Sequence, residues 1–433
     1  MANDVPIPLT LYDLADCLAG AMDLVSPVLA NHHKQVGYLA FRLGQALGMS
    51  PAACGELALA GMVHDVGALS LRERLECLGF EDDAPSRHTE AGYYLLRLFQ
   101  PLANVANMVR FHHHPWRISV APTGDGAGIP TESHILHLAD RIAVAVEPGR
   151  FLDQAEAIAR RIGERSGSVF QPDLVAAFIE LSAKEYFWLD LCSAGLGNIM
   201  ARLIRAATME LGLDDLLILD KLFSHIIDFR SPFTAAHSSG VAAVAEALAG
   251  MSGFAERECL WMRLAGYLHD LGKLAVPTEI LEKQGRLTQA EFRVIRSHSY
   301  HTFRLLEAIP TLKLVNTWGA FHHERLNGSG YPFHHRGDDL SLGSRIMAVA
   351  DVFTGITENR PYRPAMDAGE AMDVLRRMAD NAALDGEIVV RLQGHFATVN
   401  DLRARAQAVA ADEYSEFWCD VGSGQEAFTP PPN

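Results

Sequence analysis

The stretch AGYLHDLGKLAVP, residues 265–277, decides the fold, because its histidine–aspartate pair has a counterpart in AGMVHDVGALS, residues 60–70. In both copies another histidine stands 32 positions before the pair, and a later histidine stands 24 positions before a double histidine. An alanine–aspartate pair in an apolar stretch closes each copy. Matched spacings of this kind indicate a duplicated domain. The first copy contains His32, His64, Asp65, His88, His112, His113 and Asp140, and the second contains His237, His269, Asp270, His298, His322, His323 and Asp351.

Apolar residues at three- and four-residue spacing predict helices along most of the chain, and alternating β-branched runs are scarce. Proline and glycine cluster at 115–130 and 328–343, which predicts loops there. We therefore expect an all-α protein with two tandem helical domains, residues 1–195 and 196–433, each built around a buried His/Asp metal site. The final stretch, GSGQEAFTPPPN from Gly422, is typical of a disordered tail.

Composition limits the partners. A length of 433 residues suits two domains, and 49% hydrophobic residues suffice for two cores. The net charge of −16 gives no general attraction to nucleic-acid polymers or anionic membranes. The six cysteines are not clustered, which favours free thiols, and neither a membrane-spanning run nor a signal peptide is evident. We expect a cytoplasmic protein that gains positive charge for a phosphate ester from metals or a few placed lysines and arginines.

The duplicated histidines and aspartates are typical of metal ligands. Imidazole and carboxylate together suit zinc, iron, manganese, cobalt or nickel, and a buried aspartate is costly unless it is paired or metal-bound. Any one of these histidines alone is more often an ordinary core or surface residue, but an ordered and duplicated set argues against that interpretation. Seven ligand-type residues exceed the needs of one tetrahedral ion and predict at least two.

The second copy resembles the HD-GYP phosphodiesterases, a branch of the HD phosphohydrolase superfamily, over roughly residues 225–395. The matching text is residues 265–277, HHERLNGSGYP at 322–332 and SRIMAVADVFTGITENRPYRPAM at 344–366. The resemblance implies a metal-dependent phosphodiesterase that hydrolyses cyclic di-GMP to linear pGpG or GMP. Cyclic GMP-AMP is the alternative substrate. A generic HD nucleotide phosphohydrolase and a non-catalytic cyclic-dinucleotide receptor are two further functions that such a domain could have.

The resemblance also implies roles for individual residues. His237, His269 and Asp351 would hold one ion, His298, His322 and His323 a second, and Asp270 would bridge them. Iron or manganese is expected first, with nickel, cobalt or zinc as alternatives, and a third ion would need His225 and Asp228. Such ions lower the pKa of a bound water and neutralise phosphoryl charge. Lys273 is expected to protonate the leaving group or stabilise developing charge, and to contact substrate together with Gly330, Tyr331, Pro332 and Arg336.

Several positions depart from the family pattern. Asn327 stands where an aspartate is common, and His334 and His335 make the loop after the GYP sequence atypical. In the first copy Ala68 replaces the lysine, and no GYP sequence follows the histidines. The first copy is therefore expected to be a metal-bound regulatory domain, a structural partner, or a hydrolase of different specificity. A homodimer or a signalling protein is a further possible partner.

Overall fold

The structure, a computed structural model, consists of helices joined by turns and loops, and the residues that it describes contain no β-strand. This confirms the predicted all-α class. None of the helices in the described ranges has the length and apolar character needed to cross a membrane. The described residues are 9–24, 30–70, 73, 75, 77, 79, 87–118, 128–147, 149–150, 152–204, 211–229, 236–281, 283, 285–359 and 364–427.

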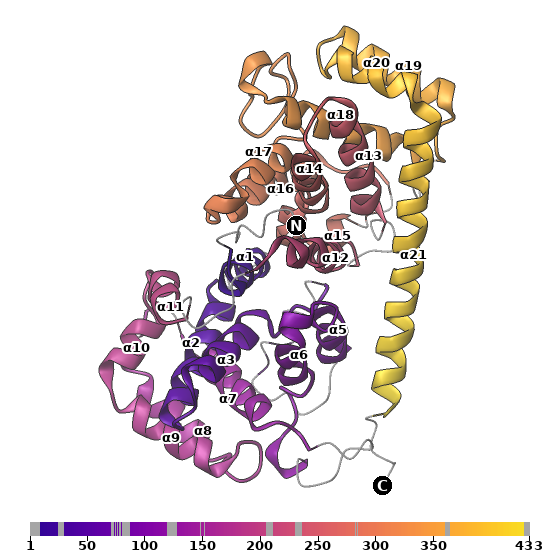
Figure 1. The fold of residues 1–433 in the computed structure, drawn as a ribbon. Coiled ribbons are helices and arrows are strands. Elements are labelled where there is room, and N and C mark those ends of the chain that lie inside the picture. Colours follow the sequence, from indigo (N-terminus) through magenta and orange to yellow (C-terminus); the bar gives the residue numbers. More distant parts are fainter. Residues whose placement is uncertain are drawn as a thin grey trace. The chain divides into compact units, whose positions relative to one another are not determined.

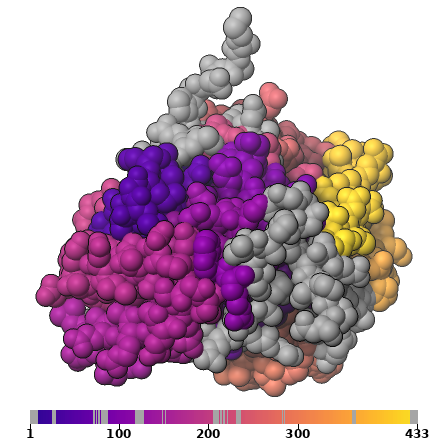
Figure 2. Space-filling model, turned by 90° about the horizontal axis from the view of Figure 1, so that it is seen from below, coloured from indigo at the N-terminus to yellow at the C-terminus, as the bar shows by residue number. Residues whose placement is uncertain are grey.

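The first of two compact units extends to Leu211 and also includes the end of the chain from Phe417. The boundary predicted between residues 195 and 196 falls before α11 (Leu196–Ile204), which still packs against α2 (His32–Ala46) of this unit. The later part of this unit, drawn in magenta, forms a continuous surface in Figure 2. The unit contains α1 (Leu11–Asp23), α2 (His32–Ala46), α3 (Pro51–Val63), α5 (Arg87–Leu96), α6 (Ala103–Arg110), α7 (Thr131–Ala145), α8 (Ala155–Gly163), α9 (Pro172–Ser182), α10 (Glu185–Leu191) and α11 (Leu196–Ile204).

The second unit spans Gly212–Glu416 and is drawn from pink to yellow in Figure 1. Its longest helix, α21, continues past the limit of the unit. The unit contains α12 (Leu213–Asp228), α13 (His237–Met251), α14 (Glu256–Leu268), the 3-10 turn η5 (Leu271–Ala275), α15 (Thr278–Leu281), α16 (Gln289–Glu307), α17 (Lys313–Ala320), α18 (Leu342–Thr357), α19 (Ala368–Asp380), α20 (Gly386–Gly394) and α21 (Phe396–Ala427).

The two units repeat one packing scheme, as the duplicated sequence predicts. Helix α2 packs on α3 and α7 as α13 packs on α14 and α18, and α5 packs on α6 as α16 packs on α17. Glycine allows the central pair to approach closely. A Cβ atom on Gly61 would lie 2.6 Å from the Gly37 backbone, and one on Gly266 would lie 2.5 Å from Ala242 Cα. Each glycine lies just before a histidine–aspartate pair, so this approach fixes where the pair emerges.

The predicted disordered tail is wrong for its first part. Helix α21 extends to Ala427, so residues 422–427 are helical, and 428–433 lie outside the described residues. Phe417 and Val421 are both buried and stand four positions apart on the same face of the helix. Burial of this apolar face favours continuation of the helix into a segment whose composition alone indicates disorder.

Candidate metal centres

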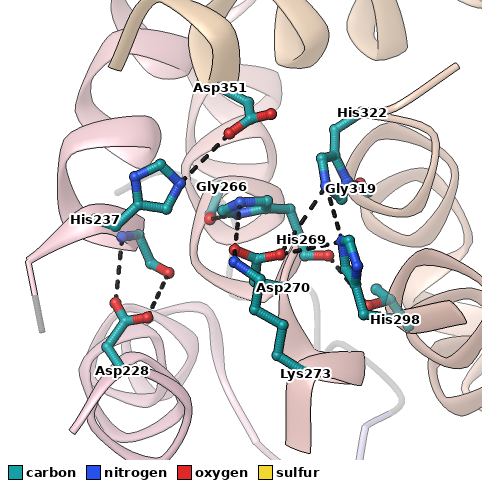
Figure 3. Close-up of polar contacts among 12 residues, drawn as sticks. Asp228, His237, Gly266, His269, Asp270, Lys273, His298, Gly319, His322 and Asp351 are labelled. Carbon is teal, nitrogen blue, oxygen red and sulfur yellow. Dashed lines mark hydrogen bonds and ion pairs between the residues drawn. The ribbon is translucent and has the colours of Figure 1, made fainter. Parts of the chain in front are cut away.

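Five elements of the second unit bring the predicted ligands together (Figure 3). His237 is the first residue of α13, His298 lies on α16 and Asp351 on α18. His269 caps the end of α14, Asp270 follows it, and His322 and His323 follow the end of α17. We call these seven residues the C-terminal centre. The helix ends and faces that carry them are positioned by the packing described above.

Interatomic distances divide the C-terminal centre into two groups joined by Asp270. The ligand atoms of His237, His269 and Asp351 lie within 4.8 Å of one another, and those of His298, His322 and His323 do the same. Asp270 lies between the groups, with Oδ2 3.1 Å from His269 Nε2 and Oδ1 3.3 Å from His298 Nε2. This grouping is the one expected for two ions and a bridging carboxylate.

Hydrogen bonds orient the imidazole rings toward the centre. The Nδ1–H groups of His269, His298 and His322 donate to backbone carbonyls three residues earlier, at 2.6, 2.6 and 2.7 Å respectively. His237 Nδ1 donates instead to Glu358 Oε1 at 3.1 Å. Each ring therefore presents Nε2 to the centre. Metal-binding histidines use their second nitrogen in this way, because the bond fixes the tautomer and the ring orientation.

The electrostatics of the centre fit divalent ions. Burial lowers the pKa of His298 to about 4 and that of His322 to about 3, which keeps both rings in the neutral form that binds metal. Burial also disfavours the charged form of His269, but the neighbouring Asp270 carboxylate outweighs it and raises that pKa. His269 Nε2 and Asp270 Oδ1 are buried, and their polar contacts at 3.1 and 3.3 Å are to other residues of the centre. A shared cation would satisfy both atoms, so the residues present fit the ions that the sequence predicts.

Lys273 lies at the edge of the centre, with Nζ 2.5 Å from Asp270 Oδ2. The sequence places it one helical turn after His269, but α14 ends at Leu268 and Lys273 belongs to the 3-10 turn η5. From this turn the lysine contacts the same oxygen, Asp270 Oδ2, that lies 3.1 Å from His269 Nε2. Gly272 is required in this turn, because a Cβ atom would overlap the carbonyl oxygen of His298.

The GYP residues form one side of the same region. The Tyr331 ring packs on the His323 ring with centroids 4.7 Å apart, and the Arg296 guanidinium carbon lies 4.4 Å from the Tyr331 ring centroid. Pro332 is half-buried beside it. A Cβ atom on Gly330 would lie 2.5 Å from Glu324 Cα, so this glycine serves backbone packing and not the close approach of a ligand.

Arg336 is exposed, and its side chain lies over Gly328, so its expected contact with substrate stays a prediction. The candidates for a third ion are engaged elsewhere. His225 Nε2 lies 3.1 Å from Glu413 Oε2, and Asp228 accepts hydrogen bonds from the backbone and hydroxyl of Ser238 at 3.2 and 3.0 Å (Figure 3). These contacts do not support a third ion.

Sequence reasoning missed three residues that hold the site in place. Glu358 orients His237 from a position 121 residues away. Glu324 is buried and accepts the backbone N–H groups of Phe333 and His335 at 2.7 and 3.0 Å, which fixes the GYP loop. Arg296 covers Tyr331. Glu324 lies within the recognised HHE sequence and so could have been found, but no local spacing marks the other two.

The first unit assembles an equivalent cluster, which we call the N-terminal centre. Asp65 is again central, with Oδ2 3.2 Å from His64 Nε2 and Oδ1 3.3 Å from His88 Nε2. His32 Nε2 lies 3.4 Å from Asp140 Oδ1. His112 and His113 complete the set, and Asp65, His88, His112 and His113 offer ligand atoms within 4.8 Å of one another. The same is true of His33, His64 and Asp65, and His33 was not predicted.

Comparison with known proteins agrees with this architecture. Profiles of the HD domain match residues 221–388 and residues 29–145. The chain is 32% identical over 386 residues to a 3'3'-cGAMP-specific phosphodiesterase 1 from Vibrio cholerae, covering 86% of this chain and 88% of the relative. The chain belongs to the HD-domain phosphodiesterases. Membership in this family confirms the resemblance that the motifs of the second copy carry.

Further members of the family differ in how much of the chain they match. A cyclic di-GMP phosphodiesterase from Pseudomonas aeruginosa is 40% identical over 158 residues, covering 36% of this chain and 37% of the relative. The crystal structure of a cyclic GMP-AMP-specific phosphodiesterase of Vibrio cholerae superposes with a TM-score of 0.62 at 24% identity. It covers 91% of this chain and 98% of that one, so both helical units of the fold have counterparts there.

Proposed function

We propose that the C-terminal centre hydrolyses 3'3'-cGAMP to a linear dinucleotide. The observation that carries the chemistry is the pair of three-residue groups joined by Asp270. When bound there, divalent ions supply an activated water and neutralise charge on the phosphoryl group. The sequence motifs favour cyclic di-GMP first. The match to a 3'3'-cGAMP-specific phosphodiesterase covers most of this chain and supports 3'3'-cGAMP as the substrate. The match to a cyclic di-GMP phosphodiesterase covers a shorter part of the chain, so cyclic di-GMP is the second candidate.

The residues of this chain have separate tasks in the reaction. Lys273 Nζ carries a proton beside Asp270 and donates it to the ribose oxygen that leaves. His237, oriented by Glu358, and the other imidazoles hold the ions in fixed positions. Tyr331, held between His323 and Arg296, presents an aromatic surface to a base, and Arg296 adds positive charge in a chain of net charge −16.

Chromatography of products tests this function. The purified protein, loaded with manganese or ferrous iron, is incubated separately with 3'3'-cGAMP, cyclic di-GMP and a nucleoside monophosphate. We expect a linear dinucleotide from 3'3'-cGAMP with a higher kcat/KM than from cyclic di-GMP. Release of phosphate from the nucleoside monophosphate, with no product from either cyclic dinucleotide, would indicate a generic nucleotide phosphohydrolase. Binding of cyclic dinucleotide without any product would indicate a receptor.

A further inference from the structure

A buried arginine lies against the N-terminal centre. Arg141, on α7, has 1% of its surface exposed. Its Nη2 lies 2.5 Å from Asp140 Oδ2, and its Nε donates to the same oxygen at 3.2 Å. The guanidinium also donates to the backbone carbonyls of Cys77 and Gly79. Arg141 thus ties a ligand on α7 to a segment more than 60 residues earlier in the chain.

In each centre a basic side chain forms an ion pair with a ligand carboxylate, but the carboxylate differs. In the C-terminal centre Lys273 pairs with the bridging Asp270, and 21% of its side chain is exposed. In the N-terminal centre Ala68 occupies the position of the lysine, and Arg141 pairs with the outer carboxylate Asp140. Both centres therefore have a positive charge beside a ligand carboxylate. Arg141 also donates to two backbone carbonyls, whereas Lys273 lies at a partly exposed edge of its centre.

The two centres also differ in access. In the C-terminal centre 23% of the His323 side chain and 15% of the Asp351 side chain are exposed. In the N-terminal centre the corresponding His113 and Asp140 are buried, as are the other five ligand-type residues. Cys77, whose carbonyl accepts from Arg141, places Sγ 3.5 Å from His88 Nδ1, so Cys77 itself lies directly against the cluster.

The N-terminal centre nevertheless has the character of a metal site. Its imidazoles are oriented like those of the C-terminal centre, because His64 Nδ1 and His112 Nδ1 donate to backbone carbonyls at 2.9 and 2.6 Å. His64 Nε2, His112 Nε2, Asp65 Oδ1 and Asp140 Oδ1 are buried, and each lies 3.2–3.8 Å from another ligand-type residue of the same cluster without a well-aligned hydrogen bond. Carboxylates and imidazoles buried together are not fully satisfied by such contacts, so a bound cation would stabilise this unit.

We propose that Arg141 is a latch that closes the N-terminal centre over its metal, making it a sealed, non-catalytic site from which metal exchanges slowly. Structural metal sites are closed, whereas catalytic ones keep a position open to solvent and substrate. Opening the latch separates a buried guanidinium from Asp140 and two carbonyls, and leaving such a charge without its partner is strongly unfavourable. The sealed centre stabilises the first unit and takes no substrate.

Chelation kinetics test the latch without reference to catalysis. The full-length protein is loaded with manganese and mixed with excess EDTA, and the retained metal is measured over time by mass spectrometry. Wild type should lose metal in two phases. Asp270→Asn should lack the fast phase, and Asp65→Asn should lack the slow one. Loss of metal from both centres in one phase, or full metal content in Asp65→Asn, would overturn the proposal.

Two further variants test whether Arg141 is the residue that slows the release of metal from the N-terminal centre. Arg141→Met keeps an unbranched apolar side chain but removes the guanidinium, and it should speed the slow phase about 10- to 100-fold, the size of effect typical of groups that hold metal ligands. Arg42→Met removes an arginine that pairs with Asp190 elsewhere in the same unit, and should leave both phases unchanged. An unchanged slow phase in folded Arg141→Met would contradict the latch. If Arg141→Met does not fold, the wild-type and Asp65→Asn time courses still decide.

Discussion

Lys273→Met isolates the contribution of the lysine at the edge of the C-terminal centre. Methionine keeps an unbranched side chain of similar length but removes the amine that lies 2.5 Å from Asp270 Oδ2. Burial alone would raise the pKa of Asp270, but His269 and then Lys273 hold it well below its usual range. Because His269 remains after the substitution, we expect Asp270 to stay ionised and the metal content to stay that of wild type.

The expected loss is in turnover. A positioned general acid or charge stabiliser contributes roughly 10²- to 10⁴-fold to kcat, so Lys273→Met should reduce kcat by about that factor. The assay combines steady-state hydrolysis of 3'3'-cGAMP with metal analysis and a thermal melt. Lys283→Met is the matched control, because Lys283 also pairs with a carboxylate, Glu291, at 2.6 Å but at the surface. A wild-type kcat in Lys273→Met would refute the catalytic role, and loss of metal would make the lysine structural.

Three further substitutions test the residues that support the site. Glu358→Gln weakens the orientation of His237 and should lower metal affinity of the C-terminal centre about 10- to 100-fold, measured by titration with manganese. Glu324→Gln removes the charge that two backbone N–H groups of the GYP loop share, and should lower stability by about 1–3 kcal/mol in urea unfolding. Arg296→Leu should raise KM with little change in metal content, because Arg296 contacts Tyr331 and not a ligand.

Each of these three predictions can be contradicted by a specific result. Unchanged manganese affinity in Glu358→Gln would mean that His237 is oriented by other contacts. Glu307→Gln, in an exposed pair with Arg304, is the control for Glu324→Gln, and equal stability of the two variants in urea unfolding would remove the role assigned to Glu324. Arg293 is exposed on the same helix as Arg296, so an equal rise in KM in Arg293→Leu would indicate a general charge effect.

The sequence predicts the helical class and the duplication, and both are confirmed because helical periodicity is local and the spacing between ligand-type residues is repeated in both copies. The division of the second set of ligands between two ions follows from the family resemblance and stays a prediction, although the structure brings those residues together. Glu358 and Arg141 could not be found in this way, since their partners come from segments distant in sequence and their roles depend on packing. Lys273 reaches Asp270 from a 3-10 turn and not from a continued helix, which the spacing from His269 alone does not indicate. The tail was judged by composition, which does not register burial of Val421.

The most direct test of the central claim compares wild type with Asp270→Ala. Asp270 joins both groups of the C-terminal centre, and the account requires it for metal binding and for hydrolysis. Wild type and the variant are loaded with manganese under the same conditions, and the folded state of each is checked by circular dichroism. The metal content and the turnover of 3'3'-cGAMP are then measured on the same samples. We expect Asp270→Ala to lose the metal of the C-terminal centre and all hydrolysis together. Full turnover by folded Asp270→Ala would contradict it.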